Sequence, residues 1–171
     1  MFARLTFYVA HAIALLFLTA GPASAQALPG CEIVPASETR ASYYQCRNGL
    51  QIELEAGSSI EIQAIDAVPP DQINLLQGGA WISLPTGSKD FQIDTPRLTA
   101  AVRGTEFAVT ADPTNSTVFV LSGRVQVTRN SDGQSTLLNA GSGITVSEGT
   151  PFEASHWSTN RIDQLNSRFG K

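Results

Sequence analysis

Two cysteines and one histidine are the residues best suited to covalent or metal chemistry after position 25 of this 171-residue sequence. Cys31 and Cys46 are close in the sequence, whereas His156 lies far from both of them. In an oxidising compartment, a cysteine pair at this spacing favours a disulfide, which would contribute about 3 kcal/mol. The alternatives are a metal pair and a nucleophilic thiol, which need His or carboxylate neighbours. We therefore expect a structural bridge that holds the N-terminal segment to the first strong strand.

The acidic residues resemble surface and turn positions more than catalytic pairs. Glu53, Glu55 and Glu61 alternate with apolar residues, so we expect them to face solvent on a strand. Segments 66–71 and 112–115 contain oxygen ligands for Ca²⁺, but neither has the spacing of a known calcium loop, and both are better explained as turns. The sequence predicts no catalytic residue, no metal site and no cofactor.

The charge balance argues against nucleic acid as a partner. The net charge is −4, and Arg4 is the one charged residue before position 26, so residues 26–171 carry −5. Lys89 and Lys171 are the only lysines. An acidic chain repels a phosphate backbone, because non-specific affinity for nucleic acid comes from neutralised phosphates.

The N-terminus has the three parts of a secretory signal peptide. Arg4 precedes an apolar stretch over residues 5–20, which is followed by Gly21-Pro22 and the small residues 23–25. The alternative is a membrane anchor, but the stretch is shorter than the ~20 apolar residues of a span and contains polar residues. We expect cleavage after Ala25, no stable membrane span, and a periplasmic or secreted location.

The remaining sequence predicts an all-β fold. Short alternating runs are separated by Gly, Pro and Asn, which is the pattern of strands. Tyr43 to Cys46 and Leu50 to Glu55 flank Asn48-Gly49, a preferred two-residue hairpin turn. Further strands are expected at 60–65, 73–76, 80–84, 91–94, 98–102, 105–110, 117–121, 125–128, 136–138 and 144–146.

Two repeated corners indicate how these strands are arranged. The segment 54–60 matches 138–144 at five of seven positions, including Gly57 and Gly141, and 76–78 resembles 121–123. In each corner, apolar runs enter and leave a glycine, as expected where a strand bends sharply. We predict a β-solenoid-like structure or a rolled β-sandwich.

The C-terminal segment has helical spacing. Trp157, Ile162, Leu165 and Phe169 favour a short amphipathic helix over about 158–168. One interpretation is that the helix lies on the β core, and the other is that its apolar face and Trp157 dock a partner.

The stretch 91–109 contains Thr95-Pro96 and then Val102-Arg103-Gly104-Thr105-Glu106-Phe107. Together with Gly123 in the pair 118–127 and Gly141 in the 138–141 corner, it resembles the FecR-type domain, an extracytoplasmic bacterial module. The resemblance covers about residues 50–149 and implies a β module with a binding role. Residues 1–25 are then a signal peptide, 26–49 a disulfide-stapled segment and hairpin, and 150–171 a tail with the helix.

The best-known FecR-type proteins combine a cytoplasmic anti-sigma segment with a periplasmic module that contacts a transporter. The signal peptide leaves no cytoplasmic segment here, so the resemblance does not imply direct anti-sigma activity. Within the motif, Arg103 and Glu106 have two interpretations. They form a structural pair at the corner, or Arg103 is a cation that faces a ligand.

Three function classes follow from these observations. The leading hypothesis is a non-catalytic module that binds another envelope protein in sensing or assembly. The alternative is binding of glycan or peptidoglycan, for which Tyr43, Tyr44 and Trp157 could stack on sugar rings. Trp81 lies in an alternating strand, where a core position is expected. An enzyme ranks third among these classes, because the sequence offers no catalytic constellation.

Overall fold

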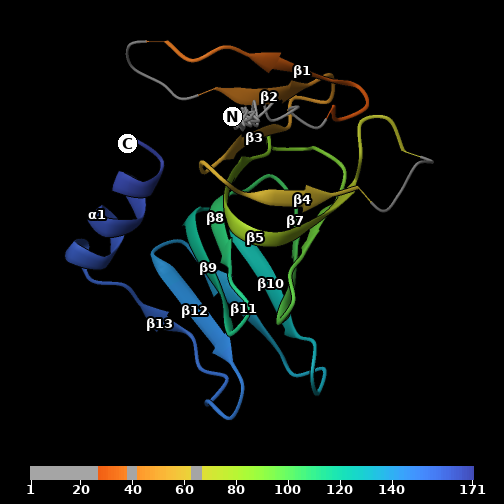
Figure 1. Cartoon of the computed structure of the whole chain (residues 1–171). Coiled ribbons are helices and arrows are strands. Elements are labelled where there is room, and N and C mark those ends of the chain that lie inside the picture. The colour runs from red at the N-terminus through yellow and green to blue at the C-terminus, as the bar shows by residue number, and fades with distance from the viewer. Residues whose placement is uncertain (1–26, 38–41, 63–66) are drawn as a thin grey trace, which may run out of the picture.

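A computed structural model describes residues 27–37, 42–62 and 67–171 of the chain (Figure 1). The predicted signal peptide and part of the predicted strand 60–65 lie outside the described residues. The fold is all-β with one short C-terminal helix, as expected from the sequence. Its elements are β1 (Cys31–Val34), β2 (Tyr43–Cys46), β3 (Gln51–Leu54), β4 (Ser59–Glu61), β5 (Gln72–Ser83), β6 (Phe91–Asp94), β7 (Leu98–Val102), β8 (Glu106–Ala111), β9 (Asn115–Ser122), β10 (Arg124–Arg129), β11 (Ser135–Asn139), β12 (Ser142–Ser147), β13 (Ser155–His156) and α1 (Thr159–Arg168).

The strands form one curled sheet that folds over itself into two leaves. We call the part made by β4, the first half of β5, β6, β7, β10 and β11 the first leaf. The second leaf contains β1, β2, β3, the second half of β5, β8, β9, β12 and β13. The rolled sandwich is therefore confirmed, and β5 is the strand that both leaves share.

The chain passes between the leaves at glycines with positive φ, which confirms the repeated corners. These crossings lie at Gly57, Gly78, Gly104, Gly123 and Gly141. Gly78 has a φ of +95° and bends β5 without interrupting it. The prediction of two strands at 73–76 and 80–84 was wrong on this point, because a glycine in this conformation turns the strand while the ladders continue on both sides of it.

The first hairpin has a different turn from the one predicted. The Gly49 N–H donates to the Cys46 carbonyl at 2.9 Å, and the Cys46 N–H donates to Leu50 at 2.8 Å. The loop thus contains three residues, with Gly49 at φ +85° in the third position. Asn48 does not have positive φ, which the two-residue type I′ turn requires. Its side chain instead accepts the Leu50 N–H at 3.1 Å.

The disulfide between Cys31 and Cys46 is present, as expected, and joins residues that lie directly opposite in the β1–β2 ladder. Strand β2 also pairs with β3, and β3 pairs with β5. The N-terminal segment therefore belongs to the second leaf. No helix in the described ranges has the length and apolarity needed to cross a membrane.

The main core fills the space between the leaves. Its largest members are aliphatic side chains from alternate positions of the strands, together with Phe107. A second cluster lies on the outer face of the second leaf, beneath α1, and contains Trp81, Ala108, Phe119, Trp157, Leu165 and Phe169. Figure 1 shows α1 alongside this leaf. The outer face of β5, β8 and β9 in the second leaf is therefore covered by α1 and Trp157.

Candidate functional site

The Thr95-Pro96 motif forms the turn between β6 and β7. The buried Thr95 hydroxyl donates to the Leu98 carbonyl at 2.8 Å and accepts the Leu98 N–H at 3.0 Å. The Asn130 side chain, from the turn after β10, donates to the Thr95 carbonyl at 2.9 Å. Thr95 therefore closes its own turn and positions a neighbouring one.

The second part of the motif forms the crossing between β7 and β8. Thr105 is buried, and its hydroxyl lies 3.1 Å from the Arg103 carbonyl and 3.0 Å from the Arg124 carbonyl, next to Gly123. Val102 and Phe107 are buried in the core, as expected. These residues hold two crossings together.

Arg103 and Glu106 do not pair with each other. Glu106 is the first residue of β8 in the second leaf, and its carboxylate accepts the indole N–H of Trp81 at 2.9 Å. Arg103 is exposed, and its guanidinium lies 3.9 Å from the Asp90 carboxylate. The corner directs the two side chains apart because it separates the end of β7 from the start of β8.

The aromatic residues proposed for glycan stacking are mostly inside the protein. Tyr44 is 8% exposed, and burial raises the pKa of its phenol. Trp157 is 5% exposed and stacks on Phe119, with ring centroids 4.7 Å apart. The prediction that Tyr44 and Trp157 present platforms for sugar rings was therefore wrong. Tyr43 is half-buried, and Trp81 is a core residue, as expected.

The helix packs on the sheet, which supports the first of its two interpretations. Leu165 and Phe169 are buried, and Phe169 meets Trp81 edge to face at 5.5 Å. The Arg161 guanidinium covers the other side of Trp157, 3.7 Å from its ring. Because these contacts occupy the apolar face of α1, this face is not available to dock a partner.

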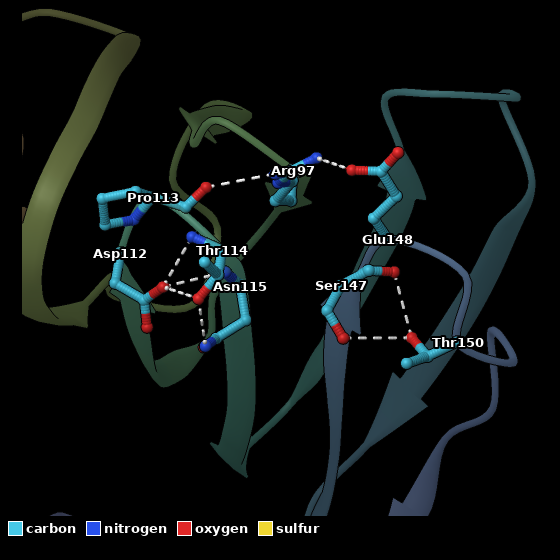
Figure 2. Close-up of polar contacts among 8 residues, drawn as sticks. All are labelled: Arg97, Asp112, Pro113, Thr114, Asn115, Ser147, Glu148 and Thr150. Carbon is cyan, nitrogen blue, oxygen red and sulfur yellow. Dashed lines mark hydrogen bonds and ion pairs between the residues drawn. The ribbon is translucent and has the colours of Figure 1, made fainter.

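Four turns meet at one end of the sandwich, and we call this region the loop end. It contains Thr95–Arg97, Asp112–Thr114, Asn130–Gly133 and Glu148–Thr150. Figure 2 shows Arg97 between two of its neighbours: its guanidinium donates to the Pro113 carbonyl at 3.1 Å and lies 3.8 Å from the Glu148 carboxylate. One arginine thus joins three of the four turns.

Asp112 organises the turn between β8 and β9 (Figure 2). Its carboxylate accepts the Thr114 hydroxyl at 2.7 Å and the Thr114 and Asn115 N–H groups at 2.8 and 2.9 Å. These bonds hold the pKa of the Asp112 carboxyl below its ordinary value, with the Thr114 hydroxyl as the main cause. The predicted turn at 112–115 is confirmed.

The turn at Asn130–Gly133 is fixed by a bidentate ion pair. Arg129 binds the Asp132 carboxylate through Nε and Nη2 and donates through Nη1 to the Thr150 carbonyl at 3.0 Å. The pair lowers the pKa of Asp132 and raises that of Arg129, chiefly through the side-chain hydrogen bond. Thr150 also donates to the Ser147 carbonyl at 3.0 Å.

Three of these turns, at Thr95–Arg97, Asn130–Gly133 and Glu148–Thr150, line a hollow of about 320 Å³. Its cations, Arg97 and Arg129, each lie beside a carboxylate from a neighbouring turn or the same turn. Among the described residues, no three His, Cys, Asp or Glu side chains gather where they could hold a metal. Sequence reasoning missed Arg97 and Glu148, because their contact joins turns that are distant along the chain, and it missed the bond from Arg129 to Thr150 for the same reason.

Comparison with known proteins gives the family. No curated protein sequence matches the chain. The sequence profile of the FecR protein family matches residues 36–126, more than half of the chain. The chain belongs to the FecR family. The matched range of this FecR-family chain, 36–126, begins and ends earlier in the sequence than the region 50–149 expected from the motifs.

Two crystal structures of candidate anti-sigma factors from Parabacteroides distasonis share the fold. The first has a TM-score of 0.59 at 18% identity and matches 72% of this chain and 58% of its own. The second has a TM-score of 0.58 at 17% identity and matches 79% of this chain and 60% of its own. The FecR-family chain thus spans about three fifths of the length of these structures.

Proposed function

We propose that this FecR-family chain is an exported, non-catalytic sensing module that binds another protein of the bacterial cell envelope. In this proposal it works outside the cytoplasm. Family membership supports the sensing role. The Cys31–Cys46 disulfide supports an oxidising compartment, because such bonds persist there and are rare in the cytosol.

The loop end is the surface that we assign to the partner, and the observation that carries this assignment is its Arg97-centred network. Arg97 binds Pro113 and Glu148, so three turns hold fixed positions relative to one another. A surface that is ordered before binding loses less conformational entropy when it binds. The exposed Thr114 and Ser131 lie on this surface and can carry a probe.

Photo-crosslinking from defined positions tests the proposal. A photoreactive amino acid is placed at Thr114 or at Ser131, and the matched control carries it at the exposed Asn160 of α1, which is outside the four loop-end turns. We expect one envelope protein to be captured from both loop-end positions and not from position 160. Equal capture from all three positions, or no specific protein from the loop end, would contradict the assignment.

Arg103 is a second position for the same experiment. It lies at the opposite end of β7 from the loop end, and its exposure leaves it able to face a partner. Capture from position 103 and not from Thr114 would move the partner to that end of the sandwich.

A further inference from the structure

The outer face of the first leaf differs from that of the second leaf, because α1 does not cover it. Strand register places Glu61, Asn74, Asp94 and Thr99 side by side across β4, β5, β6 and β7. This row contains two carboxylates and no basic residue. It therefore presents negative charge and hydrogen-bond acceptors on a sheet face that α1 leaves uncovered.

A hollow of about 360 Å³ lies on this face, between the row and the Thr95-Pro96 turn. Asn74 lines it and is 8% exposed, and its carbonyl oxygen Oδ1 accepts no hydrogen bond from any described residue. A buried amide oxygen without a donor is costly, and each such group in a native structure needs a physical account. A ligand that donates hydrogen bonds would provide one.

Asn130 contributes a second amide oxygen to the same hollow. Its amide nitrogen donates to the Thr95 carbonyl, which directs its Oδ1 to the Thr99 hydroxyl at 3.3 Å. The Thr99 hydroxyl has one proton, and its bond to Asp94, at 2.6 Å, is much shorter. The Asn130 oxygen can therefore also accept from a ligand.

Asp94 supplies the charge of the hollow. Its carboxylate accepts the Gln72 amide at 2.6 Å, the Gln92 amide at 3.0 Å and the Thr99 hydroxyl. All of these donors are neutral, and no lysine or arginine of the described chain lines the hollow. The negative charge is thus held in place by neutral groups and is not neutralised by them.

We propose that this hollow receives the ammonium group of a lysine side chain from the partner protein. An ammonium has three N–H donors around one point, which suits two amide oxygens beside a carboxylate. An arginine guanidinium fits less well, because it binds best to a carboxylate whose two oxygens are free for parallel hydrogen bonds. The oxygens of Asp94 already accept from Gln72, Gln92 and Thr99.

The rim of the hollow fits the aliphatic part of a lysine. Leu76 is 40% exposed and Pro96 is exposed, and both line the opening. A lysine places its methylene groups on apolar surface while its charged end reaches polar partners. Pro96 and Asn130 also line the loop-end hollow, so the two surfaces are continuous. The inference rests on the proposed binding of a protein partner.

A titration with small probes tests the site without the partner. The full exported chain is titrated with Nα-acetyl-lysine N-methylamide, and the side-chain amide signals of Asn74 and Asn130 are followed by NMR. The control probe is the same molecule acetylated on Nζ, which has no charge and fewer donors. We expect these signals to shift with the first probe and not with the second.

Variants then locate the charge and the acceptor. Asp94→Asn and, independently, Asn74→Ala are expected to weaken binding of the lysine probe about tenfold, or about 1.4 kcal/mol. Asp163→Asn is the matched control, because it removes the same charge from the exposed side of α1 and should change nothing. Native NMR dispersion establishes that each variant is folded, and Asn74→Ala retains the test if Asp94→Asn does not fold.

Three outcomes would overturn the inference. These are no shift with the lysine probe up to its solubility limit, equal shifts with both probes, and tighter binding of the matching arginine probe. Any of them is compatible with a partner captured at Thr114, so failure of the lysine site is distinguishable from failure of the proposed function.

Discussion

Trp81 donates its indole N–H to the Glu106 carboxylate at 2.9 Å, across the ladder that joins β5 to β8. Trp81 is 5% exposed and receives Phe169 from the end of α1 on its ring. The Lys171 ammonium lies 4.7 Å from the same ring. A carboxylate of the FecR motif thus fixes the tryptophan on which the C-terminal segment packs.

Removal of this carboxylate should destabilise the fold. Glu106→Ala leaves a buried indole N–H without an acceptor, and we expect a loss of about 1–3 kcal/mol in the free energy of unfolding, measured by urea denaturation. Arg103→Ala, at the same corner, removes an exposed side chain and should cost less than about 0.5 kcal/mol. Equal losses would restore the paired interpretation of these two residues.

Trp157 should be required for the helix. Trp157→Ala removes the ring between Phe119 and Arg161, and we expect a loss of about 3–5 kcal/mol together with a weaker helical signal in circular dichroism. Asp163→Ala, an exposed change on α1, is the control and should leave both measurements nearly unchanged. A stable variant with an intact helical signal would show that α1 is held by other contacts.

Gly78 should tolerate substitution less well than Gly57. Both have positive φ, but a Cβ at Gly57 meets open space, whereas one at Gly78 lies 2.7 Å from the Cα of Ser58. Gly57→Ala therefore measures backbone strain alone, about 1–2 kcal/mol, and Gly78→Ala should lower the free energy of unfolding further. Equal effects in thermal denaturation would mean that the β4 corner moves aside freely.

Acid should loosen the loop end through Asp112. The pKa of this carboxyl is lower in the folded protein than in the unfolded chain, so its bonds to Thr114 and Asn115 stabilise the fold fully above the unfolded value of about 3.9. That stabilisation is lost as the pH falls through the lowered folded-state pKa. Asp112→Ala should make the free energy of unfolding less dependent on pH in this range. An unchanged acid profile would show that other carboxylates dominate it.

Reduction of the disulfide should weaken the second leaf. Cys31 and Cys46 are separated by 15 positions, and opening a loop of this size costs about 3 kcal/mol in the chain-entropy model. Thermal unfolding with and without a reductant measures the loss, and the paired variant with Ser at both positions should match the reduced protein. No difference between the oxidised and reduced forms would contradict this estimate.

Local sequence patterns were sufficient for the strands and for the crossings. Alternation predicted β3, and the 138–144 repeat predicted the turn at Gly141, because both depend on residues that are neighbours in the sequence. The continuity of β5 could not be predicted in this way. The same glycine either ends a strand or bends it, and partner strands on both sides decide between these outcomes.

Side-chain exposure and long-range contacts were the least predictable features. Trp157 follows a polar stretch, and only the position of α1 on the second leaf explains its burial. Arg97 and Glu148 are distant in the sequence, and their pairing depends on the convergence of separate turns. Conversely, Arg103 and Glu106 are close in sequence, but they leave the corner in different directions.

The shared strand β5 limits how this module could transmit a signal. One half of β5 is hydrogen-bonded within the first leaf and the other half within the second, so the leaves have no hinge between them at this strand. Rotation of one leaf against the other would break ladders on both sides of Gly78. Under the proposed function, a partner that binds one face would therefore move the whole module as a rigid body, and the response would arise where the module meets its neighbours.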